Sequence, residues 1–232
     1  MTRTQRAIGC IGGVALICLL AATVWLLPAH PASTTASPAQ NLLLIDPGHG
    51  GEDGGAQAAD GTLEKNINLA IGLNLRDMLR VCGIPVEMTR QEDVSIGSST
   101  DTAIRSRKSR DMHRRLELYQ TASTVISIHQ NHFSAAQYHG AQMFYSGNHP
   151  DSRRLAECLR SSVVSGLQPD NKRELKQATD GIFLLYHAQC PAVLVECGFL
   201  SNPEERERLK QADYQQKMAW CIMTGYWKYQ TE

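Results

Sequence analysis

The sequence predicts an α/β fold in which helices lie on both faces of one central sheet. Short apolar runs, expected to be buried strands, alternate along the chain with longer segments whose apolar residues recur at helical spacing. Alternation of this kind is typical of sheets that are covered by helices. Roughly 190 residues follow the first forty, which is the size of one domain, and we find no internal repeat among them.

The first half of this domain is expected to contain two strands and one helix. Leu42–Ile45 is wholly apolar and indicates a buried strand. Apolar residues recur at helical spacing from Thr62 to Leu79, and Gly83 stands where a helix would end. Ile84–Met88 is the second expected strand. The stretch 95–110 is long and polar, so we expect a loop that is either functional or mobile.

The second half continues the alternation. Asp111–Ala122 is predicted to be helical, and the strands Val125–His129 and Ala141–Tyr145 follow. One more strand is expected at Ala192–Glu196, a short apolar run that ends in a charged residue. The remaining predicted helices are Ser152–Ser165, Pro203–Gln211 and Tyr214–Tyr229.

An uncharged apolar run, Ala7–Leu27, precedes the expected domain and follows Arg3 and Arg6. The run is long enough to span a bilayer. A signal peptide usually has a shorter core and a better cleavage site than Thr34-Thr35-Ala36, so we favour an uncleaved anchor. Because the basic residues precede the run, the N-terminus is predicted to lie inside the cell and the folded part outside.

The chain is therefore expected to have three parts. Residues 1–27 form a membrane anchor or signal sequence, residues 28–40 form a tether rich in Pro, Ala, Ser and Thr, and residues 41–232 form the folded domain. This layout predicts an extracytoplasmic protein that is either membrane-anchored or secreted.

Charge and cysteine content argue against two classes of protein. Lys plus Arg and Asp plus Glu each number 23, so nothing in the net charge predicts a nucleic-acid partner. The seven cysteines include no C-x-x-C pair, and two of them lie in the apolar run. We interpret the others as small buried residues and not as a disulfide framework.

Three of the expected strands end in ionisable residues. His49 follows the first strand through Asp46-Pro47-Gly48, and His129 and Glu196 end two others. The carboxyl ends of strands in an open α/β sheet form the ligand crevice, so these side chains are expected to converge. Glu64, at the start of the next helix, can reach the same place. Two histidines and a glutamate make a catalytic zinc set that leaves the fourth position to water.

The glycine-rich segment 48–55 around His49 permits close approach of the backbone. It could also cradle a phosphate, but it lacks the G-K-[ST] ending of a P-loop, which argues against nucleotide binding. The chain has no H-E-x-x-H sequence. A metal site must therefore be assembled from separate segments.

Four segments, taken in order, resemble the motifs of the zinc-dependent N-acetylmuramoyl-L-alanine amidases. They are Asp46-Pro47-Gly48-His49-Gly50-Gly51, Glu64-Lys65-Asn66, Ser127-Ile128-His129-Gln130-Asn131 and Val195-Glu196-Cys197-Gly198-Phe199-Leu200-Ser201-Asn202. The resemblance covers the chain from Leu42 to Tyr229. It implies that His49, Glu64 and His129 bind one zinc ion, that Glu196 is the catalytic carboxylate, and that the sheet is mixed but mostly parallel.

The resemblance also implies a substrate and a reaction. The substrate is peptidoglycan, and the bond is the amide between N-acetylmuramic acid and L-alanine of the stem peptide. An amide is a poor electrophile with a poor leaving group, so zinc is expected to polarise its carbonyl and to acidify a water molecule. Glu196 would take the proton from that water and pass it to the departing nitrogen.

Several neighbouring residues have more than one interpretation. His132 could share a metal with His129, three residues earlier, but the position in the family motif favours His129. Asp46 and Asn131 could orient metal-binding imidazoles, although a turn role is nearly as good for Asp46. Glu52 and Asp53 lie close to His49 and could tune the surroundings of the metal, but we favour solvated loop acids. The remaining histidines of the domain are interpreted as surface or supporting residues: His113, His139, His149 and His187.

The basic residues of the stretch 95–110 either steer the anionic substrate or are simply solvated: Arg105, Arg107, Lys108 and Arg110. In detail, the run from Met88-Thr89-Arg90 to Tyr145-Ser146 resembles the amidase subgroup that acts in spore-cortex maturation. Two other functions remain open on residue types alone, a zinc carboxypeptidase or endopeptidase acting on the wall and a non-catalytic wall-binding regulator. The need for an accessory protein also stays open.

Overall fold

The computed structural model describes residues 41–97 and 104–232. The predicted anchor, the predicted tether and residues 98–103 of the predicted loop lie outside the described residues. In the described part of the chain, no helix is both long and apolar enough to cross a membrane. The elements in order are β1 (Leu43–Pro47), α2 (Glu64–Val81), β2 (Val86–Met88), α3 (Ile104–Tyr119), β3 (Thr124–Asn131), β4 (Gln142–Tyr145), α4 (Asp151–Gly166), β5 (Lys176–Gln177), α5 (Phe183–His187), β6 (Ala192–Phe199), α6 (Pro203–Leu209) and α7 (Ala212–Thr231).

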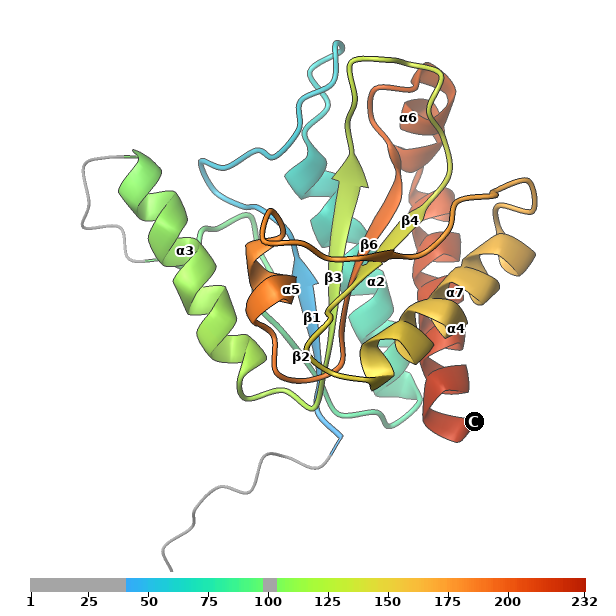
Figure 1. Ribbon diagram of the computed structural model, residues 1–232. Helices are drawn as coiled ribbons and strands as arrows, with labels where there is room; N and C mark the ends of the chain where they lie inside the picture. The colour runs from blue at the N-terminus through green and yellow to red at the C-terminus, as the bar shows by residue number, and fades with distance from the viewer. Residues whose placement is uncertain (1–40, 98–103) are drawn as a thin grey trace, which may run out of the picture. The chain divides into compact units, whose positions relative to one another are not determined.

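The strands form one six-stranded sheet in the order β2-β1-β3-β6-β4-β5. Strands β2, β1, β3 and β6 are parallel, whereas β4 runs antiparallel to β6. Helices α2, α4 and α7 cover one face, and α3 and α5 cover the other (Figure 1). The prediction of a mixed, mostly parallel sheet with helices on both faces is confirmed.

The larger core lies under α2, α4 and α7. Alternate residues of the central strands point into it, among them Ile45, Ile128 and Val195, all fully buried. The intervening residues, such as Leu44 and Val125, point to the other face of the sheet and form a smaller cluster with α3 and α5. Because both faces of β1, β3 and β6 are covered, these strands read as continuous apolar runs in the sequence.

Local sequence explains several helix boundaries. Gly83 adopts φ 73° after the last turn of α2, where its backbone N–H donates to the carbonyl of Arg80, so the predicted helix stop is confirmed. The side chain of Asn202 accepts hydrogen bonds from the backbone N–H groups of Glu204 and Glu205, and Pro203 occupies the first turn of α6.

The predicted loop 95–110 is wrong for its second half, because α3 begins at Ile104 and not at Asp111. The first half of α3 is strongly polar, which hid its helical character in the sequence. The prediction also missed α5 and β5. The five cysteines of the described part are free, and of these only Cys82 is exposed.

Candidate metal centre

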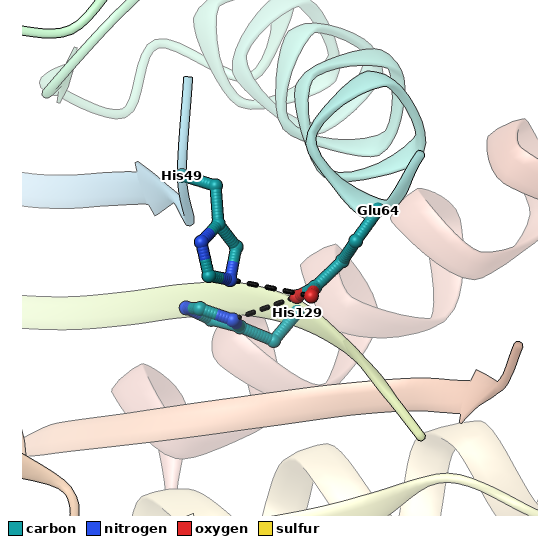
Figure 2. A group of neighbouring side chains, drawn as sticks. All are labelled: His49, Glu64 and His129. Atoms are coloured by element: carbon teal, nitrogen blue, oxygen red, sulfur yellow. Dashed lines mark hydrogen bonds and ion pairs between the residues drawn. The ribbon is translucent and has the colours of Figure 1, made fainter. Parts of the chain in front are cut away.

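His49, Glu64 and His129 meet at the carboxyl edge of the sheet. One possible ligand atom from each residue lies within 4.8 Å of the other two. His49 follows β1, Glu64 begins α2 and His129 lies near the end of β3. Figure 2 shows that both imidazole rings direct a nitrogen at the carboxylate of Glu64. His49 Nε2 lies 3.2 Å from Glu64 Oε2, and His129 Nδ1 lies 2.8 Å from Glu64 Oε1.

The carboxylate of Glu64 is fixed by protein donors as well as by the two rings. The backbone N–H of Ala56 donates to Oε2 over 2.8 Å, and that of Gln130 donates to Oε1 over 3.1 Å. Asn68, one helical turn along α2, donates to Oε1 over 3.2 Å. Glu64 is only 4% exposed. Its position is therefore set before any ion binds.

The ring of His49 is oriented by Asp53. His49 Nδ1 donates to Asp53 Oδ2 over 2.8 Å, which leaves Nε2 to face Glu64. A carboxylate behind a metal-binding imidazole fixes the ring and its tautomer. The favoured interpretation of Asp53 as a solvated loop acid is thus wrong, and its contact with His49 fits the alternative, in which it tunes the surroundings of the metal.

Two glycines make room for this group of side chains. A Cβ at Gly48 would lie 2.2 Å from His129 Nε2, and a Cβ at Gly55 would lie 2.5 Å from Glu64 Oε2. Both distances are far below van der Waals contact. Gly55 also has φ 69°, a region that residues with a Cβ rarely occupy. The glycine-rich segment therefore supplies the space for the candidate ligands, as its composition predicted.

The donor set and its spacing fit a zinc ion. A tetrahedral ion about 2 Å from each ligand atom needs those atoms roughly 3.3 Å apart. One possible ligand atom from each of the three residues lies within 4.8 Å of the others, which is close enough for one ion to reach all three after small adjustments. Two imidazole nitrogens and one carboxylate oxygen are ligands that zinc takes in catalytic sites, where a fourth position stays open. His49, Glu64 and His129 together could therefore hold such an ion.

Mutual interaction shifts the pKa values of two of these groups in the metal-free protein. Burial acts to lower the pKa of His49, but hydrogen bonds to Asp53 and Glu64 outweigh it and raise the pKa to about 9. Burial acts to raise the pKa of Glu64, but the hydrogen bonds from His129 and His49 hold it well below its usual range. The metal-free site thus carries a proton where a cation would bind.

Glu196 lies next to His129 on the neighbouring strand. The two residues are paired in the register of β3 and β6, so their side chains project from the same face of the sheet. In the described part of the chain, Glu196 Oε2 is one of the few buried side-chain oxygens without a hydrogen-bond partner. Burial, together with the nearby Glu64 charge, raises the pKa of Glu196 to about 7. A buried carboxylate oxygen without a partner, beside a candidate metal site, indicates a functional group.

The other predicted residues lie elsewhere or have different roles. His132 is exposed, whereas His129 is part of the group. Asp46 is fully buried and bonds to Arg115, Thr89 and Tyr119 and not to an imidazole. Burial acts to raise the pKa of Asp46, but the Arg115 guanidinium and these hydrogen bonds lower it to about 2.

Two basic residues of α3, Arg107 and Lys108, contact the loop that follows His49. Arg107 pairs with Glu52 at 2.5 Å and Lys108 with Asp53 at 3.3 Å. The side chain of Arg105 lies outside the described residues. These two cations are therefore paired with Glu52 and Asp53, which the sequence interpretation did not foresee.

A cavity of about 850 Å³ opens beside the two imidazole rings. His49 and His129 line one part of it, the apolar residues Ile182 and Phe183 line another, and Met112 of α3 contributes from the side. The cavity gives a substrate access to the candidate ligands from the α3 and α5 face of the sheet.

The fold and the site together define a class of protein. An α/β sheet that gathers two histidines and a glutamate at its carboxyl edge, with an unpaired carboxylate beside them and an open cavity in front, has the arrangement of a metal-dependent hydrolase. The model of the family Amidase_3, N-acetylmuramoyl-L-alanine amidase, matches residues 43–226. The chain belongs to this family of hydrolases, so the resemblance found in the sequence is confirmed.

Individual relatives agree with the family. The chain is 34% identical over 193 residues to the germination-specific N-acetylmuramoyl-L-alanine amidase of Bacillus subtilis. The matched region covers 82% of this chain and 80% of the relative. The solved structure of the CwlD amidase from Clostridioides difficile, in complex with the GerS lipoprotein, is 38% identical with a TM-score of 0.79 and covers 82% of this chain and 98% of that one. The amidase AmiC2 of Nostoc punctiforme is 28% identical with a TM-score of 0.68, over 82% and 97% of the two chains.

Proposed function

We propose that the chain is a zinc-dependent peptidoglycan amidase that cleaves the bond between N-acetylmuramic acid and the L-alanine of the stem peptide. The observation that carries the proposal is the unpaired carboxylate of Glu196 in register with His129, beside a His-Glu-His group able to hold one zinc ion. Membership of the amidase family supports the choice of bond.

The residues divide the work of the reaction. A zinc ion held by His49, Glu64 and His129 would supply Lewis-acid polarisation of the scissile carbonyl and would make water more acidic. Glu196 has a free oxygen with which to orient the attacking water and accept its proton. The same carboxyl group then donates that proton to the L-alanine nitrogen as the carbon–nitrogen bond breaks. A pKa of about 7 suits a group that must both accept and donate a proton near neutral pH.

Zinc binding is expected to release a proton from His49. The ion needs His49 Nε2 unprotonated, whereas a pKa raised to about 9 keeps the metal-free ring protonated at about pH 7.5. Deprotonation of His49 should therefore make the apparent affinity for zinc rise roughly tenfold for each pH unit up to about pH 9. Titration calorimetry in two buffers of different ionisation enthalpy measures the released proton. The variant D53N, which removes one partner that raises the pKa, should release less, and a wild-type release of zero would contradict the assignment.

We place this activity outside the cytoplasm, at the cell wall. Relatives from Staphylococcus epidermidis that are named as probable cell wall amidases support an extracytoplasmic site of action. Residues 1–27 would hold the catalytic domain, residues 41–232, at the membrane through the tether 28–40, or would be removed on secretion. The likeness to a germination-specific amidase supports spore-cortex peptidoglycan as the physiological substrate.

Digestion of purified peptidoglycan, followed by mass spectrometry of the products, tests the proposal. Vegetative wall and spore cortex are digested in parallel, with and without a metal chelator. We expect intact stem peptides with a free L-alanine amine, released only without the chelator and from cortex at least as fast as from vegetative wall. Shortened stem peptides would instead identify a carboxypeptidase or endopeptidase, and wall binding without any release would identify a non-catalytic module.

A further inference from the structure

We propose that Arg90 and Arg115 are positioning residues that hold the ligand loop, defined as residues 47–49, in its metal-binding conformation. The inference rests on the proposed zinc site and goes beyond it, because neither arginine is among the candidate ligands. Both arginines are buried, with exposed fractions of 3% and 2%. Their guanidinium groups donate to all three backbone carbonyls of the ligand loop.

The ligand loop has a conformation that the backbone does not favour by itself. His49 adopts φ 63°, in the left-handed region, and it is one of only two described residues other than glycine that do so. A residue with a Cβ in this region persists when its surroundings fix it. The loop also leaves the sheet here, so the carbonyls of Pro47, Gly48 and His49 need other donors.

Arg115 reaches the loop from α3. Its Nη2 donates to the carbonyl of His49 over 2.7 Å, and its Nη1 donates to the carbonyl of Pro47 over 3.1 Å. The guanidinium is itself anchored by two carboxylates, through Nη1 to Asp46 and through Nε to Asp111 Oδ2 at 2.6 Å. A buried ion-pair network therefore fixes the direction of the His49 carbonyl. Because the backbone of His49 is fixed, the direction in which its imidazole side chain leaves the backbone is fixed as well.

Arg90, which follows β2, contacts the ligand loop from a second segment of the chain. Its Nε donates to the carbonyl of Pro47 over 3.0 Å, and its Nη2 donates to the carbonyl of Gly48 over 2.9 Å. The same Nη2 donates to the carbonyl of Lys65 over 2.8 Å. Lys65 is next to Glu64 in the first turn of α2. Arg90 thus joins the segment that carries one candidate ligand to the segment that carries another.

The guanidinium group is specifically suited to this task. It offers five donors in a rigid planar fork, so one side chain can serve several fixed acceptors at once. A lysine retains the positive charge but presents a single compact ammonium group on a flexible stem. Substitution by lysine therefore removes the multiple anchoring while it keeps the charge. Residues that orient metal ligands in this way typically change metal affinity about 10–100-fold when they are replaced.

The experiment compares the zinc dissociation constants of the wild-type chain, R90K and R115K, measured by competition with a chelating indicator. The melting temperature of each metal-free protein is measured beside it. We expect both lysine variants to bind zinc about 10–100-fold more weakly, and R90K to melt close to the wild type. At saturating zinc both variants should recover most of the wild-type kcat.

Two controls separate positioning from general stability. R154K alters an exposed arginine that also donates to a backbone carbonyl, that of Tyr229 over 2.8 Å. Arg154 is far from the ligand loop in the sequence. Its zinc affinity should stay within about twofold of the wild type, outside the 10–100-fold range of residues that orient ligands. R90K is the decisive variant where R115K fails to fold, because the described partners of Arg90 are all backbone carbonyls and no buried acid is left unpaired.

The outcomes are distinct. A folded R90K variant with the zinc affinity of the wild type would overturn the inference and leave the proposed function intact. A wild-type chain that binds no zinc would instead overturn the proposed metal site, and the inference with it. Weaker zinc binding in R90K at an unchanged metal-free melting temperature supports the positioning role.

Discussion

The variant E196Q is expected to hydrolyse peptidoglycan about 10²–10⁴-fold more slowly than the wild type, the usual contribution of a general acid–base group. Glutamine keeps the size and shape of the side chain but can no longer accept and return a proton. The zinc content should not change, because Glu196 is not among the three grouped ligand candidates. Product release from cortex peptidoglycan and metal analysis of the same protein sample test both halves of the expectation.

A matched control is E204Q, which makes the same chemical change on the exposed surface of α6. Its activity and zinc content should equal those of the wild type. An E196Q variant that loses zinc would make Glu196 a ligand and not the proton carrier. An E196Q variant with full activity would remove it from the mechanism altogether.

Replacement of His129 by alanine is expected to abolish stoichiometric zinc binding, whereas H132A should retain one zinc ion per chain. The two histidines are three residues apart, but only His129 directs a ring nitrogen at Glu64, at 2.8 Å. His132 is exposed and lies beyond β3. Loss of a direct ligand should weaken binding by more than the roughly 100-fold that loss of an orienting residue costs.

Metal analysis after gel filtration measures this difference, and H132A serves as the control for the loss of an imidazole from the same segment. If H132A lost its zinc and H129A kept it, the assignment of the second histidine ligand would be reversed. Both variants should keep the wild-type circular dichroism spectrum, because neither side chain packs in the hydrophobic core.

The parts of the fold that the sequence predicted are those in which burial leaves a simple pattern. β1, β3 and β6 lie in the middle of the sheet with both faces covered, so their apolar runs stand out. The start of α3 was missed for the opposite reason. Its first seven residues, 104–110, contain one apolar residue, Ile104, and therefore show no helical apolar spacing. Two of the polar residues there, Arg107 and Lys108, pair with acids of the loop after His49 and not with the core.

Other features depend on partners that local sequence does not specify. β4 is buried at Gln142 and Met143 and partly exposed at Phe144 and Tyr145, a pattern that does not indicate its direction. Only its pairing with β6, which follows it by many residues, makes it antiparallel. β5 has two exposed residues and no apolar pattern at all. Neither its existence nor its place at the edge of the sheet could be derived from periodicity.

The candidate site shows the same division. The convergence of His49, His129 and Glu196 could be predicted because the carboxyl ends of parallel strands meet at one edge of the sheet. Most of the groups that support these residues could not be predicted from the sequence. Asn68 is an exception, because it follows Glu64 by one helical turn on the buried side of α2. Asp53 reaches His49 through a left-handed turn, which spacing alone does not reveal.

The three anchored carbonyls of residues 47–49 also set a limit on protein engineering. A designer who transplanted the segment Asp46–Gly51 onto another parallel sheet would move the histidine but leave its donors behind on α3 and after β2. The grafted turn would relax toward ordinary backbone angles, and its imidazole would swing away from the intended ion. The smallest portable unit is therefore the turn with both arginines and the acids that anchor Arg115.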